Sequence, residues 1–404
     1  MSLKDAQNQH YKENKDDWAL AQAFYSTDDT ERYLTQGKYE SDGAYRSRVR
    51  AAHAFPYSRQ IIHRISDQLL LRADEVEREL GPIPSRYVDA AGPDEESHQL
   101  QMKTLGDYLL LFGEAWLQVR PTGSGAELRV LTPLTVPRWK GEKVLTLGTR
   151  SKESTIFEGE QKETTYTVHT PTGWTTYALR KKEGSKEKKR VEVESGTYSP
   201  GEETAFFVDA GGNRTPPLMR FSMPWDTVLG IEVAKTHLQM FRLENQIDGR
   251  LHTALTSGQL VYNGLDEDGE EKVIHSHKKG RNLIFLPEDA DVEPLEVPTE
   301  AVTMGEERLA TKEETLYETA YNALQAATAE SSATETVVKQ QSTAAALATL
   351  ASTVESAEES VLRLVAQAYN IVDLGGPNPS DPGVSSDWTS IDWSESRVDL
   401  SRED

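Results

Sequence analysis

The stretch spanning residues 225–370 constrains the fold of this chain more than any other part of it. Along it come a long helical pattern, a compact polar insertion, a second helical pattern, a Ser/Thr-rich break and an Ala-rich helical pattern. In order, the segments are residues 225–256, 257–297, 298–329, 330–339 and 340–370. Long helices joined by a small compact insertion and a short non-helical segment indicate a structural protein rather than an enzyme.

The first and last of these helices show the clearest periodicity. The first is predicted to be capped by Asp226 and to extend to about Ala254, a rod of about 40 Å. In the last helix the apolar positions alternate three and four residues apart, which is typical of a packing seam. Those positions are Leu347, Leu350, Val354, Ala357, Val361, Leu364 and Ala368.

The first half of the chain predicts helices followed by strands. Short helices and an arm are expected over residues 1–50, then one helix over 57–72 and another over 93–111, which Gly113 closes. The second helix is expected to turn four leucines inward, namely Leu100, Leu105, Leu109 and Leu110. From Ala115 the period becomes two, which predicts an antiparallel meander. Its strands are expected at 115–119, 127–131, 144–149, 164–170, 174–180, 190–194 and 204–208, with a last strand at 388–393.

Composition limits the classes of function. The chain has 404 residues and a formal net charge of -22, so its field repels polyanions and it cannot hold DNA by broad phosphate neutralisation. If this protein meets DNA, it therefore either contacts it at a small local site or lets it slide past without holding it. The alternatives are that the acidity serves solubility or reflects a salty habitat. The chain contains no cysteine, which excludes disulfides and thiolate metal sites.

Hydropathy points to an extended or self-associating molecule. The hydrophobic share is 37% and the mean hydropathy is -0.61, low for one compact globule. Such a chain either exposes much polar surface or buries area against copies of itself. No transmembrane run and no signal peptide is predicted.

The order of these elements resembles the portal proteins of tailed bacteriophages. Three sequence segments support the resemblance. They are residues 216–221 (PPLMRF) before the first long helix, residues 281–287 (RNLIFLP) in the insertion, and the small-residue segment 328–346. The resemblance implies an α+β portal fold with an α/β wing, a long helical stem, a small α/β clip, a tunnel loop and a long C-terminal wing helix. Because the chain stops at Asp404, it also implies a crown that is short or absent.

The resemblance assigns a part to each segment. It implies a wing over residues 1–224, stem helices over 225–256 and 298–329, a clip over 257–297, a tunnel loop over 330–339, and the long wing helix with a final strand over 340–404. Portals form rings of about twelve subunits with cyclic contacts at one capsid vertex. The implied partners are further copies of the chain, the major capsid protein and scaffold, the terminase large subunit, the head–tail adaptor, and double-stranded DNA passing without sequence specificity. The implied location is the virion, after assembly in the host cytoplasm.

Five glutamates form a candidate channel lining on the second stem helix. They are Glu306, Glu307, Glu313, Glu314 and Glu318. Several are seven residues apart and so share a helical face, opposed only by Arg308 and Lys312. In a ring, such faces would make an acidic wall, where DNA phosphates find no cations to replace their counterions. The alternative is an ordinary solvated helix face.

The break and the insertion hold the other candidate residues. The tunnel-loop candidates are Ser331, Ser332, Thr334, Thr336 and Lys339, and a plain helix linker is the alternative. The clip candidates for partner contact are His275, His277, Lys278, Lys279 and Arg281. The two histidines lack a third ligand, so no metal site or other cofactor is predicted. Residues 266–269 resemble the start of a calcium loop but lack its closing glutamate.

Two further observations say less about function. The basic run over 180–190 is interpreted as a solvated hairpin tip, with a nucleic-acid patch or contacts to an acidic neighbouring subunit as alternatives. No phosphate-binding loop or nucleophile motif is present, so the chain is predicted not to be an enzyme, and ATP hydrolysis must come from another chain. The alternatives to a portal are a head–tail adaptor or minor capsid protein, which would lack the clip, and, more remotely, a hydrolase.

Overall fold

The structure is a computed structural model of the chain, and it combines helices and strands as the α+β prediction requires. It describes residues 7–38, 40–70, 77–78, 83–122, 125–152, 161–181, 188–198, 207–209, 212–256, 260–265, 271–273, 291–294, 299–326, 335–373 and 391–392. The chain divides into two compact units. Unit 1 comprises residues 1–28, 55–235 and 317–404, and unit 2 comprises residues 29–54 and 236–316.

Helices α1 (Gln9–Ser26), α3 (Tyr57–Leu70) and α5 (His98–Phe112) pack together in unit 1, with the short α4 (Arg86–Asp89) beside α5. Helix α5 ends at Gly113 as predicted, in the left-handed conformation, and the Gly113 N–H donates to the Leu109 carbonyl. The prediction for Leu100 is wrong, since 44% of it is exposed. It lies in the first turn of α5, where its N–H donates to the capping Ser97 hydroxyl.

Two sheets replace the single predicted meander. A three-stranded sheet has the order β11-β2-β3, and a five-stranded antiparallel sheet runs in chain order from β4 to β8. The strands are β2 (Glu114–Thr122), β3 (Gly125–Leu131), β4 (Arg138–Lys140), β5 (Lys143–Lys152), β6 (Gln161–His169), β7 (Gly173–Lys181), β8 (Lys188–Thr197) and β11 (Leu218–Ser222). The 3-10 turn Pro133–Thr135 follows β3 and separates the sheets, because proline cannot continue a ladder. Shorter pairs join β9 (Phe207–Val208) to β10 (Arg214–Thr215), and β1 (Glu77–Arg78) to β15 (Ile391–Asp392).

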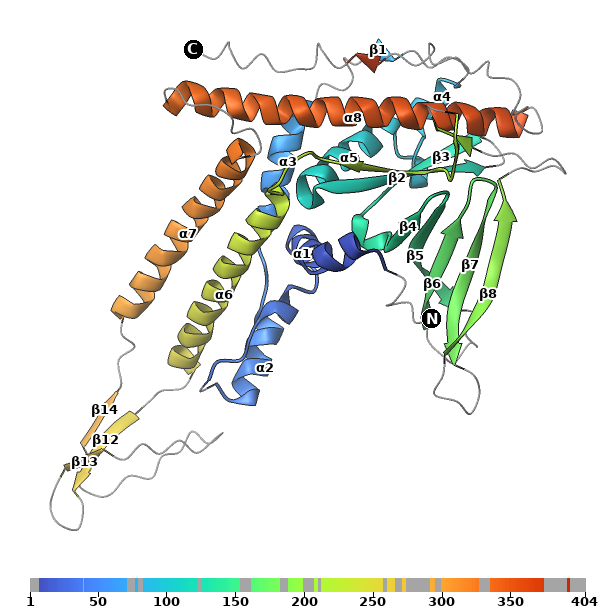
Figure 1. Ribbon diagram of the computed structural model, residues 1–404. Coiled ribbons are helices and arrows are strands. Elements are labelled where there is room, and N and C mark those ends of the chain that lie inside the picture. Colours follow the sequence, from blue (N-terminus) through green and yellow to red (C-terminus); the bar gives the residue numbers. More distant parts are fainter. Residues whose placement is uncertain are drawn as a thin grey trace. The chain divides into compact units, whose positions relative to one another are not determined.

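The predicted seam of the last long helix is confirmed as a buried face. Helix α8 (Glu335–Asp373) buries all seven seam residues, from Leu347 to Ala368. It packs on α5 and on strands β2, β3 and β11, as Figure 1 shows. The seam thus faces mainly a sheet, and it joins parts of unit 1 that are far apart in sequence.

The two other long helices are also present, with shifted ends. They are α6 (Leu229–Thr256) and α7 (Thr299–Ala326). Asp226 does not cap α6, because the first turn closes when the Glu232 N–H donates to the Val228 carbonyl. Packing fixes this start, since Gly230 lies against the backbone of Leu111. None of the described helices has both the length and the apolar character needed to cross a bilayer.

The insertion between α6 and α7 contains a small antiparallel sheet in the order β13-β12-β14. The strands of this sheet are β12 (Leu260–Leu265), β13 (Glu271–Val273) and β14 (Asp291–Pro294).

Candidate functional site on the paired long helices

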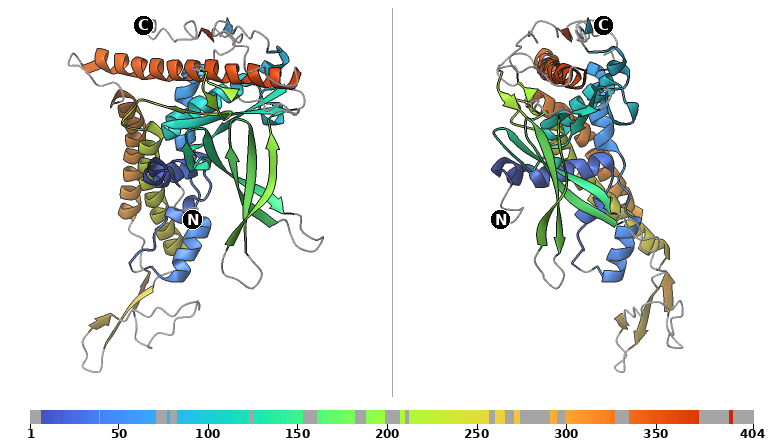
Figure 2. Two further views of the ribbon diagram at one scale, coloured as in Figure 1. Left: turned by 45° about the vertical axis from the view of Figure 1, so that its right-hand side comes forward. Right: turned by 90° about the vertical axis from the view of Figure 1, so that its right-hand side faces the viewer.

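Helices α6 and α7 lie side by side and antiparallel (Figures 1 and 2). The Lys312 ammonium donates to the Gln239 side-chain carbonyl at 2.9 Å. About two helical turns away, Gly305 faces Ile247, where an added Cβ would lie 3.0 Å from the nearest side-chain carbon. Leu316 is fully buried and lies four residues after Lys312, so it shares the side of α7 from which Lys312 reaches Gln239. The approach of Gly305 to Ile247 and the contact between Lys312 and Gln239 therefore join the described parts of the two helices.

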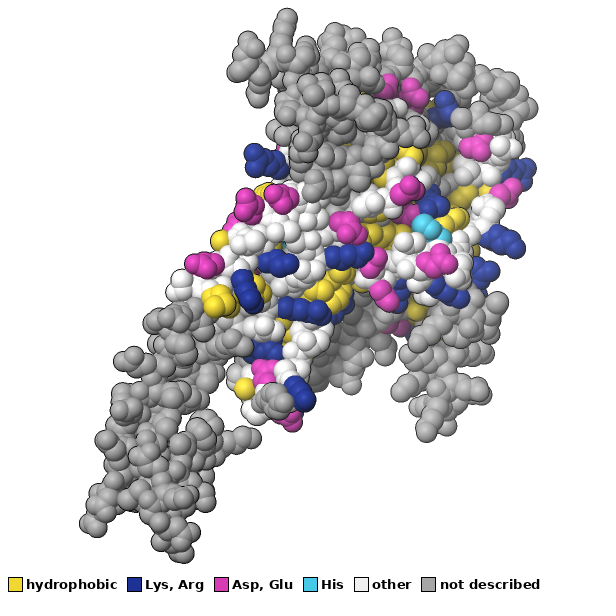
Figure 3. Space-filling model, turned by 60° about the vertical axis from the view of Figure 1, so that its left-hand side comes forward, with side chains coloured by type: hydrophobic (Ala, Val, Ile, Leu, Met, Phe, Trp, Pro, Cys, Tyr) yellow, Lys and Arg dark blue, Asp and Glu magenta, His cyan; other side chains and the backbone are white. Residues whose placement is uncertain are grey.

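The five predicted channel glutamates do not share one environment. Glu306, Glu307, Glu314 and Glu318 are exposed, whereas Glu313 is half-buried. At about 100° of rotation per residue, Glu307, Glu314 and Glu318 point away from the buried Leu316 and Ala320, so they form the flank of α7 opposite α6. Glu306 and Glu313 lie on the edge between that flank and α6. Lys and Arg side chains stand among the acidic ones on the face drawn in Figure 3.

Glu313 belongs to an acidic cluster with two residues of α6. Burial first, and then the nearby Asp248 and Glu313 carboxylates, together raise the pKa of Glu244 to about 7. Sequence reasoning missed Glu244 and Asp248 because they lie on the other helix of the pair. No local pattern distinguishes them from other charged positions of α6, so the cluster emerges only from the packing.

The Glu244 carboxyl predicts a pH-dependent stability. Its pKa in the folded protein, about 7, lies above the ordinary value of about 4.3. Its contribution is therefore fully present below pH 4 and is lost as the pH rises through 7. Glu244→Gln should raise the free energy of unfolding at pH 8 by about 1–2 kcal/mol. This is less than the full shift in the pKa of Glu244 implies, because the carboxyl group is partly solvated.

Denaturant unfolding at pH 5 and pH 8 measures this effect. The gain should be much smaller at pH 5, where Glu244 is largely protonated. Glu142→Gln, in the exposed turn between β4 and β5, is the control and should change stability little at either pH. An equal effect of Glu244→Gln at both pH values would contradict the electrostatic origin.

The structure places two of the five tunnel-loop candidates in a helix. Helix α8 begins at Glu335, so Thr336 and Lys339 are helical and the predicted break is shorter. Ser331, Ser332 and Thr334 lie outside the described residues.

The clip candidates all lie outside the described residues, namely His275, His277, Lys278, Lys279 and Arg281. Their role in partner contact stays a prediction. Among the residues that the structure describes, no group of three or more His, Asp or Glu side chains is placed to hold a metal ion.

The ends of the basic run over 180–190 are engaged within their own sheet. Arg180 donates to both carboxylate oxygens of Glu163, and the Arg190 guanidinium lies 3.3 Å from the centre of the Tyr177 ring. An aromatic side chain thus accompanies the cations, from a neighbouring strand rather than from the run itself. Residues 182–187 lie outside the described part of the chain.

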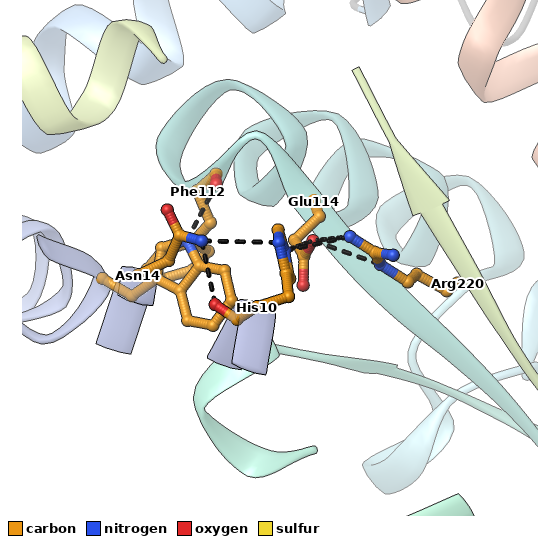
Figure 4. A network of polar contacts seen from close by, with 6 residues as sticks. His10, Asn14, Phe112, Glu114 and Arg220 are labelled. Carbon is orange, nitrogen blue, oxygen red and sulfur yellow. Dashed lines mark hydrogen bonds and ion pairs between the residues drawn. The ribbon is translucent and has the colours of Figure 1, made fainter. Parts of the chain in front are cut away.

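A polar network in unit 1 includes Arg220, a residue of the segment 216–221 that supports the sequence resemblance. Arg220, from the segment 216–221, forms an ion pair with Glu114 of β2, and Glu114 also contacts His10 of α1 at 2.7 Å (Figure 4). Asn14 donates to the His10 carbonyl at 2.9 Å. These contacts tie α1, β2 and β11 together, so Arg220 has a structural role.

Comparison with known proteins gives limited matches. A family model described as a domain of unknown function (DUF4055) matches residues 231–368, roughly a third of the chain, and spans α6, α7 and most of α8. No curated protein matches. Among solved structures, the chain is similar to one from the virion of a native gene transfer agent (GTA) particle, with 12% identity, 76% of each chain covered and a TM-score of 0.33.

A second solved structure comes from the neck of an empty GTA particle computed with C6 symmetry. It is 12% identical, with 83% of this chain and 84% of that chain covered and a TM-score of 0.30.

Proposed function

We propose that this chain is a portal subunit of a tailed bacteriophage, which assembles into a ring around a channel for DNA. The observation that carries the proposal is the order of long helix, small β insertion, long helix and longest helix, realised as α6, β12–β14, α7 and α8. Two long antiparallel helices joined by a small domain make a wall element that can repeat around an axis. Its role is passive and needs no catalytic group.

Exposed apolar side chains on α7 support a subunit that meets copies of itself. Met304 and Tyr317 are 53% and 42% exposed. Large apolar side chains gain free energy when a neighbouring surface covers them. In the proposed ring, the stem of each subunit contacts two neighbours, and the insertion provides the clip surface for the terminase large subunit and later the head–tail adaptor. The wing would meet the major capsid protein and scaffold.

The acidic edge of α7 would form the channel wall in this proposal. A ring repeats Glu306 once per subunit, so a single glutamate becomes a belt of negative charge. Duplex DNA moving past that belt finds no cations with which to exchange its counterions, and it slides rather than binds.

Reversing that belt tests the channel role. Glu306→Lys rings should bind duplex DNA with an affinity that falls steeply with salt, whereas wild-type rings should show no binding at about 0.15 M salt. Fluorescence anisotropy of labelled duplex measures both. Glu142→Lys, an equally exposed reversal in the turn between β4 and β5, is the matched control. Binding by Glu306→Lys rings no stronger than by Glu142→Lys rings would remove the channel role from Glu306.

A further inference from the structure

Helix α2 (Asp42–Ala51) of unit 2 is well formed but buries none of its residues. It begins at Ser41, whose hydroxyl accepts from the Ala44 N–H at 3.3 Å. The Tyr45 hydroxyl donates to the Leu34 carbonyl at 3.1 Å, and Arg48 pairs with Glu40 at 2.7 Å. Helices shorter than about 12 residues are marginal in water unless tertiary packing supports them. Helix α2 therefore presents a face that a partner would stabilise.

That face carries a net positive charge, two arginines against one aspartate, although the chain as a whole is strongly acidic. Arg46 and Arg50 are both exposed and lie one helical turn apart. Among the described residues, neither forms an ion pair. Because Arg48 is engaged with Glu40, the charge that α2 offers to a partner comes from these two arginines and from Asp42, which accepts a hydrogen bond from the Gln36 amide.

The complementary surface lies on α7 of the same unit. Glu307 and Glu314 are exposed, lie two turns apart, and belong to the flank of α7 that points away from α6. On another side of α6, Arg242 donates to the Tyr33 carbonyl, in the segment that leads into α2. Figure 1 and the left-hand view of Figure 2 show α7 and α2 on opposite sides of α6 within this unit.

Head-to-tail contacts in a ring bring opposite flanks of identical subunits together. We propose that α2 of one subunit docks on α7 of the next, with Arg46 and Arg50 facing Glu307 and Glu314. This inference rests on the proposed ring. It divides the acidic residues of α7 between two tasks: the flank farthest from α6 meets the neighbour, and the edge with Glu306 and Glu313 stays with the channel. Such charge pairs set the partner and the register of a contact.

Paired charge reversals test the contact in the full-length protein. The first variant carries Arg46→Glu and Arg50→Glu, so both of its flanks are acidic. The second carries Glu307→Arg and Glu314→Arg, so both are basic. Each variant alone should assemble only at a protein concentration at least about tenfold higher than the wild type, because like charges meet at every contact.

Mixing the two variants one to one should restore assembly, since each acidic flank then meets a basic one. Mass photometry of each variant and of the mixture measures this, and recovery also shows that both variants are folded. Lys12→Glu with Lys15→Glu, on the exposed side of α1, is the matched control and should assemble like the wild type. Two variants that assemble like the wild type, or a mixture that stays monomeric, would overturn the contact while leaving the ring itself intact. A wild-type protein that forms no ring would instead overturn the proposed function.

Discussion

Replacing Glu358 with alanine should lower the free energy of unfolding of unit 1 by about 3–5 kcal/mol. Glu358 of α8 and His98 of α5 are both fully buried, and the His98 Nε2 atom lies 2.8 Å from a Glu358 carboxylate oxygen. Truncating Glu358 removes the oxygen that this nitrogen contacts and leaves a polar ring in an apolar interior. The cost of a polar group that has lost its partner is therefore added to the cost of the cavity.

Denaturant unfolding followed by circular dichroism measures this loss. Glu359→Ala, at the next position of α8 and only half-buried, should change stability by no more than about 0.5 kcal/mol. In the double variant with His98→Ala, the second substitution should cost less than it does alone, because it removes the group left without a partner. A loss below about 1 kcal/mol for Glu358→Ala would show that the pair does not hold α8 in place.

Gly230→Ala should destabilise unit 1 by about 2–3 kcal/mol, although alanine is the better helix former by about 1 kcal/mol. An added Cβ at this position would lie 2.4 Å from the Cα and the carbonyl oxygen of Leu111. Backbone atoms inside a packed helix cannot move aside as the end of a flexible side chain can. The substitution must therefore push the start of α6 away from the end of α5.

Gly43→Ala supplies the opposite result at a matched helical glycine. Gly43 lies in the first turn of the exposed helix α2, and an added Cβ there would meet nothing within 4 Å. Stability should rise by up to about 1 kcal/mol, because only the backbone freedom of the unfolded chain changes. Thermal unfolding of both variants compares the two effects, and a Gly230→Ala protein as stable as Gly43→Ala would disprove the close approach of α6 and α5.

Much of the helical architecture could be predicted because its signal is local. The three-and-four spacing from Leu347 to Ala368 marks a buried face, and every seam residue is buried. Gly113 ends α5 because glycine adopts the left-handed conformation without strain. In both cases a few neighbouring residues determine the outcome.

What could not be predicted depends on distant parts of the chain. Strand β11 pairs with β2, which lies about a hundred residues earlier in the chain. The segment 216–221 before α6 therefore contributes an edge strand to a sheet. The periodicity of Leu100 resembles that of its buried neighbours, yet it stands in the first turn of α5, beyond the core. The separation of Glu306 and Glu313 from the other three glutamates depends on which side of α7 meets α6, and among the described residues of α7 only Leu316 and Ala320 are buried to mark that side.

The central claim is that this chain closes into a ring around a channel. Electron microscopy of the purified full-length protein, with particles viewed down their axis, tests it most directly. We expect closed rings of about twelve subunits with an open centre. A protein that stays monomeric at every salt concentration would contradict the account.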